Sequence, residues 1–424
     1  MFPEERLSRR EMMALQVRRL DEARQRMLRL APVAGRWREA KVGDRPLRDV
    51  REIEGFPFMT KADLRDNYPL GLFGVPREEV RRIQGSSGTR GKPTLVGYSA
   101  ADIEMWAEVV ARCLALVGAR PGESLHNAYG YGLFTGGLGL HQGAERLGLT
   151  VVPASSGGTP RQLLLLRDLR PEGLACTPSY ALNLAESLRR EGTDPRSIGL
   201  RWGIHGAEPW SDGLRRAIEE AFGMDACDIY GLSEVIGPGV AAECREAKDG
   251  LHVHEDHFLV EVVDPETGAT LPDGEEGELV FTTLTREVSP VWRYRTGDVA
   301  SITREPCRCG RTTVRMSRLK GRVDDMFVLR GVNIFPSEIE RLILEDPALT
   351  PHYLLRLTRP GTMDDLRVEV EAVPGEGETA AGRLAARLKD TFGLRIEVSV
   401  VPQGAVPRSE GKAKRLIDER EVSR

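Results

Sequence analysis

The chain has 424 residues, and its 60 basic and 64 acidic side chains leave a formal net charge of −4 at pH 7. This near balance gives no electrostatic basis for binding nucleic acid or an anionic membrane surface. No apolar run has the length of about 18–20 residues that a membrane-spanning helix needs. Residues 1–20 carry early acids and lack a signal-peptide apolar stretch, so we expect a cytoplasmic protein of two or three domains.

Helical and strand-like stretches alternate from about residue 100 to 300, after an amphipathic helix predicted near the N-terminus. Apolar residues at helical spacing and short β-branched runs between turn residues distinguish the two types. The order predicts a largely parallel sheet with helices on its faces. The predicted helices cover 100–118, 161–169, 179–192 and 211–223, and the predicted strands cover 148–155, 173–179, 200–209 and 227–231.

The pattern changes after residue 256. Residues 258–284 contain two strands joined by turn residues, which favours an antiparallel or barrel-like piece. The chain beyond 324 predicts a small α+β domain, with helices over 336–346 and 379–393 and strands over 352–359, 366–373 and 395–402. We therefore expect an α/β protein whose N-terminal domain (1–323) has mainly parallel sheets and a small β-barrel-like part. A smaller, mobile α+β domain (324–424) follows it.

Residues 85–94 form a loop rich in glycine and hydroxyl side chains, in which backbone N–H groups can wrap a phosphate chain. It is not a Walker A loop, because the glycine spacing differs and Pro93 follows Lys92 where that motif has Ser or Thr. A flexible surface turn is the alternative interpretation of such a stretch taken alone.

A second glycine-rich stretch, 129–139, lacks the strand, spacing and downstream acid of a dinucleotide-binding fingerprint. We interpret it as a loop that leads into a helix starting near Gly137. Tyr129, Tyr131 and Phe134, together with Gly136, are predicted to line an apolar substrate pocket. Ordinary core packing is the alternative role for the three aromatic residues.

Five separated segments carry candidate motifs. In chain order they are 86–94, 228–234, 294–298, 321–340 and 407–415. Together they resemble the core motifs of the acyl-adenylate-forming superfamily. Residues 126–139, 206–210, 228–244 and 331–340 look like those of the phenylacetate-CoA ligase family, and the resemblance extends from about residue 50 to the C-terminus. It implies an AMP-forming ligase that activates an aromatic carboxylic acid with ATP and transfers the acyl group to coenzyme A.

The resemblance also implies roles for individual residues. Glu234 would hold Mg²⁺ through oxygen ligation, Tyr230 would offer a flat face to adenine, and Asp298 would bind the ribose hydroxyls. The predicted ATP contacts are Ser86, Ser87, Gly88, Thr89, Gly91, Lys92, Ala207, Glu208, Pro209, Asp228, Ile229, Tyr230, Gly231, Ser233, Asp298 and Arg322.

Catalysis in this family needs two arrangements of the C-terminal domain. By resemblance, Lys412 reaches the cleft and bridges the attacking carboxylate and the α-phosphate, and Glu234 is the second catalytic residue. Asp324 is the matching hinge residue. After rotation, the segment that begins with Arg330, Gly331 and Val332 would line the path of the coenzyme A thiol.

A structural zinc site is a further expectation. Cys307 and Cys309 form a tight turn, and Cys244 and His252 flank a short hairpin-like stretch, so the four make up a Cys₃His set. His254, which we expect on the same strand face as His252, is the alternative fourth ligand. Free cysteines beside a solvated histidine are the alternative to a metal site.

Some alternatives stay open at this stage. Arg90 stands where the family usually has a second threonine, which affects the fine geometry of ATP binding. Phenylacetate is the leading acid, with substituted benzoates, hydroxyanthranilate-like acids and indoleacetate as alternatives. The acceptor is alternatively the phosphopantetheine arm of a carrier protein. A non-catalytic nucleotide- or aryl-acid-binding protein is the alternative from another class, and the resemblance also allows a homodimer.

Overall fold

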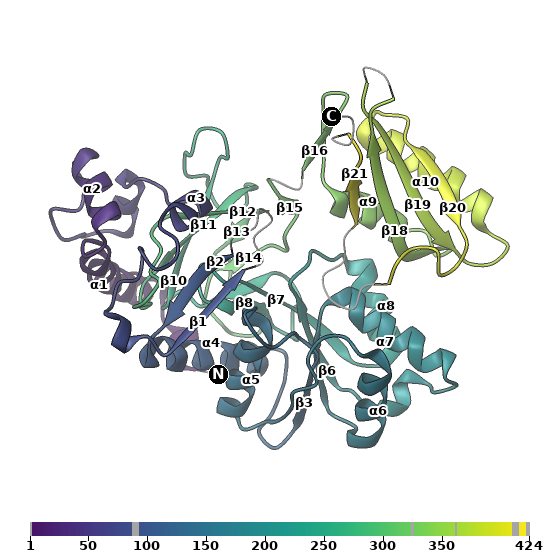
Figure 1. Cartoon of the computed structure of the whole chain (residues 1–424), viewed down its shortest axis with the longest axis horizontal. Coiled ribbons are helices and arrows are strands. Elements are labelled where there is room, and N and C mark those ends of the chain that lie inside the picture. Colours follow the sequence, from purple (N-terminus) through teal and green to yellow (C-terminus); the bar gives the residue numbers. More distant parts are fainter. Residues whose placement is uncertain (1, 87–92, 324–325, 361–362, 409–414, 421–424) are drawn as a thin grey trace.

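The computed structural model (Figure 1) describes residues 2–86, 93–323, 326–360, 363–408 and 415–420. Its largest sheet consists of β3 (Ser124–Asn127), β4 (Thr150–Val152), β5 (Gly173–Cys176), β6 (Trp202–Gly206), β7 (Asp225–Leu232), β8 (Gly237–Glu243), β9 (Leu251–Val253), β13 (Ile302–Thr303) and β14 (Arg315–Met316). The spatial order of these nine strands is β13-β14-β9-β8-β7-β6-β5-β3-β4.

One half of this sheet is parallel and the other half is antiparallel. From β4 to β7 each neighbouring pair runs parallel, as the alternating helix and strand pattern predicts. From β7 onward the neighbours are antiparallel, and that extension was not predicted. Ligand sites in sheets of this kind form beyond the carboxyl ends of the parallel strands, where the connections change direction.

Helices cover the sheet and supply most of its core. They are α4 (Ala100–Leu116), α5 (Thr135–Leu147), α6 (Thr159–Leu169), α7 (Pro178–Arg190) and α8 (Asp212–Phe222), with a 3₁₀ turn η4 at Pro195–Ile198. The start of α4 is fixed by a capping box, in which the Ser99 hydroxyl accepts a bond of 3.0 Å from Asp102 N. Leu163, Leu188 and Phe222 belong to one buried cluster between α6, α7 and α8.

A second sheet and an N-terminal helical segment complete the larger part of the molecule. The sheet has the order β10 (Phe258–Val263), β11 (Gly277–Thr283), β12 (Tyr294–Ala300) and β15 (Gly321–Arg322). Before it come η1 (Pro3–Arg6), α1 (Arg9–Met27), α2 (Ala31–Glu39), η2 (Val50–Gly55), α3 (Lys61–Asp66), η3 (Arg77–Glu79), and the hairpin of β1 (Arg82–Ser86) and β2 (Thr94–Tyr98).

The expectation of a barrel-like piece is wrong in one respect. The turn residues between 258 and 284 do connect antiparallel strands, with Val260 opposite Phe281. Among the described residues, however, these strands form an open four-stranded sheet and not a closed barrel. In the part of the chain that the structure describes, β11 is the one neighbour of β10 in this sheet. Trp37 and Phe56 of the N-terminal segment pack against Trp292, which precedes β12.

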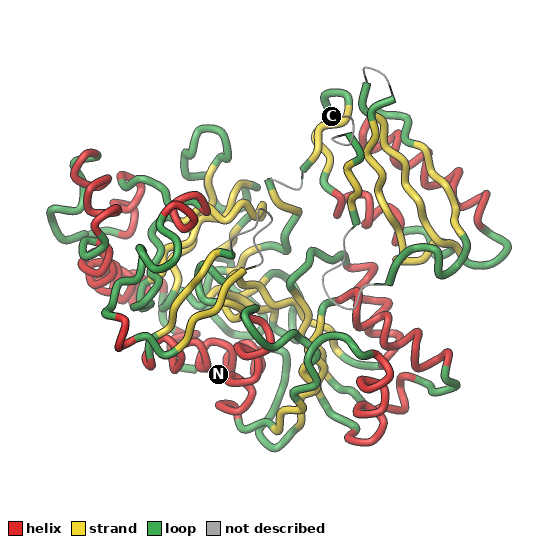
Figure 2. The backbone as a smooth tube through the Cα atoms, in the orientation of Figure 1, coloured by secondary structure: helices red, strands yellow, loops and turns green. Residues whose placement is uncertain are grey.

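The C-terminal lobe, residues 326–420, has a hydrophobic core of its own. It contains β16 (Phe327–Leu329), β17 (Val332–Ile334), α9 (Pro336–Leu344), β18 (Leu349–Thr358), β19 (Asp365–Ala372), α10 (Gly377–Phe392), β20 (Glu397–Val401) and β21 (Leu416–Asp418). The sheet order is β20-β19-β18-β21, and α9 and α10 pack against it (Figure 2). Ile339, Leu355 and Leu384 are among the buried residues between these layers.

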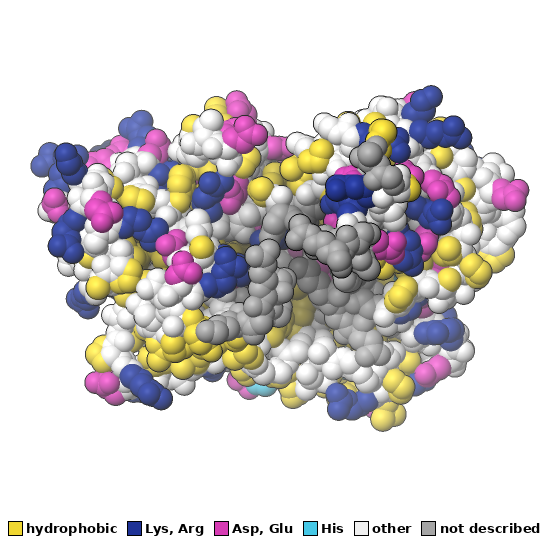
Figure 3. Space-filling view, turned by 45° about the horizontal axis from the view of Figure 1, so that its top comes forward, with side chains coloured by type: hydrophobic (Ala, Val, Ile, Leu, Met, Phe, Trp, Pro, Cys, Tyr) yellow, Lys and Arg dark blue, Asp and Glu magenta, His cyan; other side chains and the backbone are white. Residues whose placement is uncertain are grey.

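The C-terminal lobe lies over α7 and α8 of the larger part, and α9 contacts α8 (Figure 1). On the face shown in Figure 3, basic and acidic side chains are interspersed. Within the described part of the chain, none of the helices combines the length and the hydropathy that crossing a bilayer requires.

Candidate active site

A cavity of about 170 Å³ opens beyond the carboxyl ends of β6 and β7. It lies where the large sheet changes from parallel to antiparallel pairing, which is the expected position for a ligand site. Its lining residues are Gly206, Ala207, Glu208, Pro209, Trp210, Asp228, Ile229, Tyr230, Gly231, Leu232, Leu251, Asp298, Met316, Arg318, Leu319 and Arg322. The structure thus brings together nine residues that were predicted as ATP contacts, from Ala207 to Arg322.

Asp298 occupies the centre of a hydrogen-bonded group in this cavity. Arg322 lies opposite Asp298 in the β12–β15 register, and its Nη1 donates to Asp298 Oδ1 at 2.7 Å. The Tyr230 hydroxyl donates to Asp298 Oδ2 at 2.7 Å. Burial raises the pKa of Tyr230 well above its ordinary value, and the charge of Asp298 adds to this effect. The tyrosine therefore stays a neutral hydrogen-bond donor, and the carboxylate has a fixed orientation.

The loop that follows β6 forms one wall of the cavity. Ala207 has a φ of +69°, a left-handed conformation that costs free energy for a residue with a Cβ atom. The next residue, Glu208, accepts a bond of 2.8 Å from the backbone N of Ser179, at the start of α7. This contact fixes the strained turn against the neighbouring helix.

Asp228 lies on the β7 wall of the cavity. Burial raises its pKa well above the ordinary value, and the nearby carboxylate of Glu243 acts in the same direction. The protonated form of the Asp228 carboxyl is therefore favoured. In that form the group can donate a hydrogen bond as well as accept one.

Glu234 and Ser233 lie in the turn between β7 and β8, outside the cavity lining. Glu234 is 6% exposed, and its Oε1 atom lies 3.9 Å from Nζ of Lys61. The Ser233 hydroxyl is 3.1 Å from that of Thr135. A fully buried guanidinium, that of Arg286, donates to the backbone oxygen of Glu234 at 2.7 Å. Neither Lys61 nor Arg286 was predicted, because each stands in the sequence as a single basic residue without a motif.

The four predicted substrate-pocket residues are placed differently from one another. Tyr129 is buried, and its hydroxyl donates to the backbone oxygens of Cys176 and Gly206 at 2.8 and 3.3 Å. Tyr131 meets His141 edge to face, and Phe134 is 45% exposed at the start of α5. A Cβ atom on Gly136 would lie 2.5 Å from the Phe134 ring. Only Tyr129 has a described contact with a residue that lines the cavity.

Several predicted site residues fall outside the described residues: Ser87, Gly88, Thr89, Arg90, Gly91, Lys92, Asp324 and Lys412. Ser86 is the last residue of β1, and the β1–β2 hairpin leads into and out of the predicted phosphate loop. Arg330 and Gly331 form the turn between β16 and β17 with positive φ angles of 51° and 85°. Arg330 contacts Asp365 at 3.1 Å, and Val332 begins β17. A role of this turn in the thiol path stays a prediction.

Charged groups connect the C-terminal lobe to α7. Nε2 of His352 contacts Oε1 of Glu186 at 2.5 Å, and Nε of Arg408 is 3.3 Å from Oε2 of the same carboxylate. Arg408 also donates to both oxygens of Glu371 at 2.8 Å. A small crevice beside these groups is lined by residues of both lobes, including Ser179 and Arg415.

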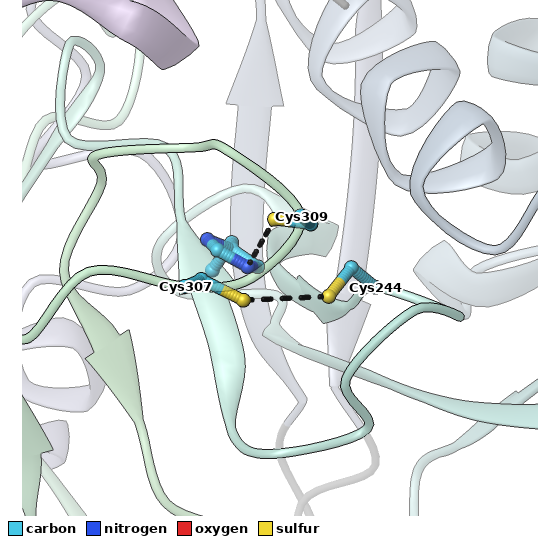
Figure 4. Close-up of side chains that lie close together, drawn as sticks. Cys244, Cys307 and Cys309 are labelled. Atoms are coloured by element: carbon cyan, nitrogen blue, oxygen red, sulfur yellow. Dashed lines mark hydrogen bonds between the residues drawn. The ribbon is translucent and has the colours of Figure 1, made fainter.

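The predicted cysteine and histidine ligands form one cluster. Figure 4 shows the thiols of Cys244 and Cys307 facing each other, and their sulfur atoms are 3.7 Å apart. The Cys309 sulfur is 3.4 Å from Nε2 of His252. All four candidate ligand atoms lie within 4.8 Å of one another.

His254, the alternative ligand, is not part of this cluster. Its Nε2 atom lies 3.3 Å from the sulfur of Cys113, on α4. The expectation that it shares a strand face with His252 is wrong because β9 ends at Val253, so that the period of two does not continue to His254. Nδ1 of His252 is 2.9 Å from the Thr313 hydroxyl, which orients Nε2 toward the cysteines.

Three comparisons with known proteins identify relatives of this chain. Residues 74–284 match the AMP-binding enzyme family, and residues 331–420 match the AMP-binding enzyme C-terminal domain. The chain is 51% identical over 400 residues to the phenylacetate-coenzyme A ligase of Thermus thermophilus, with 90% of each chain covered. Two structures of 2-hydroxyisobutyryl-CoA ligase are 31% and 32% identical, and each comparison covers 99% of this chain and 92% of the other.

Those two structures show the same ligase in different states. The TM-score is 0.92 for the postadenylation state in complex with R3-HIB-AMP. It is 0.74 for the thioesterification state in complex with 2-HIB-AMP and CoA. Because identity and coverage are nearly equal, the difference reflects how the parts of the molecule are arranged. The arrangement of the lobes in this chain is therefore closer to that of the postadenylation structure than to that of the thioesterification structure.

Proposed function

Because the chain belongs to the phenylacetate-coenzyme A ligase family of AMP-binding enzymes, we propose that it activates phenylacetate with ATP and transfers the acyl group to coenzyme A. The observation that carries this proposal is 51% identity over 90% of both chains to a phenylacetate-coenzyme A ligase. The products are AMP, pyrophosphate and phenylacetyl-CoA.

The cavity beyond β6 and β7 suits the nucleotide. Asp298 faces it with an oriented carboxylate that is suited to accepting hydrogen bonds from the ribose hydroxyls. Tyr230 supplies an aromatic wall for adenine, and the strained backbone at Ala207 brings the β6 loop to the edge of the base. These three assignments are part of the proposal and are supported by the common lining of one cavity.

Mg²⁺ would be held by Glu234, whose carboxylate is buried two residues beyond the cavity-lining Leu232 and offers the hard oxygen ligands that this ion prefers. The ion would screen the negative charge of the triphosphate. The chain's own contribution is the position of this carboxylate, which Arg286 fixes through the backbone oxygen of Glu234.

The two half-reactions assign different tasks to the C-terminal lobe. The predicted domain boundary at residue 324 and the hinge at Asp324 allow that lobe, as a mobile lid, to move between them. Lys412 stabilises charge during adenylation, and the turn at Gly331 approaches the site during thioester formation. We expect Lys412→Ala to abolish formation of the acyl-adenylate while largely sparing thioester formation from supplied adenylate. An equal loss of both steps would contradict this assignment.

A structural zinc ion forms a separate part of the proposal. With Zn–S bonds of about 2.3 Å, the sulfur atoms of a tetrahedral site lie about 3.8 Å apart. The separation of 3.7 Å between Cys244 and Cys307 fits this value. Burial lowers the pKa of His252 to about 3, with the guanidinium groups of Arg311 and Arg315 adding to it, so the imidazole is in its neutral, ligating form. Cys309 completes the set.

Elemental analysis tests the zinc proposal. We expect about one zinc per chain, loss of the metal in Cys307→Ser, and a lower melting temperature after chelation. Purified protein that contains no zinc and whose melting temperature does not respond to a chelator would remove this part of the proposal.

The thiol acceptor, the cellular location and the oligomeric state are further parts of the proposal. A carrier protein is the alternative acceptor, because its phosphopantetheine arm offers the same thiol. A cytoplasmic location is supported by six cysteines that form no disulfide. A homodimer is the assembly that the family resemblance favours.

The direct test measures pyrophosphate release with ATP, Mg²⁺ and a panel of aryl acids, with and without coenzyme A. We expect release that depends on phenylacetate, with AMP rather than ADP as product, and phenylacetyl-CoA only when coenzyme A is present. Adenylate formation without transfer to coenzyme A would favour the carrier-protein alternative. Release with none of the acids would contradict the proposed function.

A further inference from the structure

The segment that precedes α3 is attached to the strand that carries Asp298. Met59 N donates to the backbone oxygen of Arg293 at 3.1 Å, and Arg295 N donates to Met59 O at 2.9 Å. Met59 thus forms a parallel bridge with Tyr294, the first residue of β12. Two backbone bonds fix the position at which α3 begins, relative to the nucleotide cavity.

The first turn of α3 is also fixed by side chains. The Asp63 carboxylate accepts bonds from the Thr60 backbone N and hydroxyl at 2.7 and 3.2 Å. Its other oxygen is 2.9 Å from Nη1 of Arg36, on α2. Thr60, Asp63 and Arg36 therefore fix the first turn of α3, from which the Lys61 side chain extends.

Lys61 points toward Glu234, which belongs to a different part of the chain. Its Nζ atom lies 3.9 Å from Glu234 Oε1. The Lys61 side chain is 40% exposed, whereas that of Glu234 is 7% exposed. The ammonium group therefore lies on the solvent side of the buried carboxylate.

The Lys61–Glu234 contact is a weak ion pair by itself, because the distance from nitrogen to oxygen is long for an ion pair and Lys61 is well exposed. A flexible lysine side chain can change partners within this range. Arg65, one helical turn further on, is the second basic residue on this side of α3. Its charge acts on the hydroxyl of Tyr294, where it opposes the rise in pKa that burial causes.

We propose that Lys61 is a phosphate-binding residue of the adenylation site and contacts the β- and γ-phosphates of ATP beside Glu234. The proposal deepens the proposed function and rests on it. In adenylation, a carboxylate oxygen of the acid forms a bond with the α-phosphorus. The bond from that phosphorus to the α–β bridging oxygen breaks, and the electron pair leaves with pyrophosphate. Lys61 stabilises the charge that gathers on this leaving group.

The test compares ligands with and without the distal phosphates. Binding of magnesium ATP and of AMP is measured by calorimetry for the wild-type enzyme, Lys61→Ala and Lys61→Arg. We expect Lys61→Ala to weaken ATP binding about 10- to 100-fold and to leave AMP binding unchanged. In the reverse reaction, from phenylacetyl-adenylate and pyrophosphate, we expect KM for pyrophosphate to rise by a similar factor. Lys61→Arg keeps the charge and should retain most of the ATP affinity.

A charge-matched control is Lys389→Ala, which removes an exposed lysine from α10 in the C-terminal lobe and should leave both affinities unchanged. Equal weakening of ATP and AMP binding by Lys61→Ala would overturn the inference, since it would place the effect at the α-phosphate, the ribose or the local fold. Unchanged ATP binding would overturn it as well. Absence of phenylacetate-dependent pyrophosphate exchange in the wild-type enzyme would instead contradict the proposed function.

Discussion

Two protein contacts of Asp298 hold different oxygens of its carboxylate. Arg322 uses one carboxylate oxygen and Tyr230 the other. A carboxylate accepts hydrogen bonds at both oxygens, so bonds to each of them fix the orientation of the group. The proposed ribose contacts depend on this orientation, because an acceptor held at a fixed angle needs no rearrangement when the nucleotide binds.

We expect Asp298→Asn to weaken binding of ATP about 10- to 100-fold, because an amide of the same shape turns a donor toward Arg322 or the Tyr230 hydroxyl and cannot accept from both. Calorimetric titration with ATP measures the effect. The matched control is Asp273→Asn, which removes a carboxylate from the half-exposed pair with Arg304, outside the cavity. A loss of affinity in both variants, or in neither, would contradict the role assigned to Asp298.

The buried histidines give the folded state a pH dependence with a definite sign. Burial is the main cause that lowers the pKa of His205 and of His257 to about 4, and that of His254 to about 3. Each histidine has its ordinary pKa near 6.5 in the unfolded chain, which therefore binds more protons below that pH than the folded protein does. The contribution of these histidines to the free energy of unfolding is fully present above their pKa in the unfolded chain. It is lost progressively as the pH falls toward their pKa in the folded protein.

We therefore expect the free energy of unfolding to fall between about pH 7.5 and pH 5.5, with about 1 kcal/mol of that loss due to His205 alone. Urea denaturation at both pH values measures it. His205→Gln keeps a donor for the Cys176 carbonyl that His205 contacts. This variant should show a smaller loss than the wild type, and an identical loss would show that His205 does not contribute.

At the residue scale, sequence motifs identified residues that line the cavity but did not identify the basic residues that contact Glu234. Ala207, Tyr230 and Asp298 belong to segments with a recognisable pattern, and the structure gathers them around one cavity. Lys61 and Arg286 reach Glu234 from distant parts of the chain. Each is a single basic residue, and a contact over such a sequence separation leaves no local pattern to detect.

At the scale of elements, periodicity predicted the helices and the parallel strands, because each has one face that must be buried. Helices α4, α7 and α8 lie where apolar spacing places them. The antiparallel extension of the large sheet was not predictable in this way, since β13 and β14 have two residues each. Such short strands are defined by their partners in space and not by their own sequence.

The contact between α4 and α5 depends on glycines. A Cβ atom at Gly143 would lie 2.3 Å from Cγ1 of Val110 and 3.0 Å from the backbone N of Ala111. We expect Gly143→Ala to lower the free energy of unfolding by about 1–3 kcal/mol, because the two helices would have to separate. Chemical denaturation measures this change.

The control for that substitution is Gly382→Ala on α10, where an added Cβ atom meets nothing within 4 Å. This change should stabilise the protein by about 0.4–1 kcal/mol, because alanine restricts the unfolded chain. Equal effects of the two substitutions would mean that the α4–α5 contact is not as close as the structure has it.

At the scale of the whole molecule, one carboxylate connects the two lobes near the predicted catalytic segment. Glu186 on α7 contacts His352 and Arg408 of the C-terminal lobe. Arg408 directly precedes residues 409–414, which include Lys412 and lie outside the described residues. The arrangement of the lobes is closer to that of the postadenylation structure than to that of the thioesterification structure, so we expect the Glu186 contacts to favour the arrangement used in adenylation.

Removal of the Glu186 charge should therefore shift the balance between the two states. We expect Glu186→Gln to slow adenylate formation about 2- to 5-fold while thioester formation from supplied adenylate stays at least as fast. A partly exposed ion pair contributes about 1 kcal/mol or less, and 1 kcal/mol changes a two-state ratio about fivefold. The control is Glu191→Gln, at the end of the same helix, whose partner Arg167 belongs to the same lobe. Slowing of both half-reactions by the same factor would show that Glu186 supports the fold of α7 and not the choice between states.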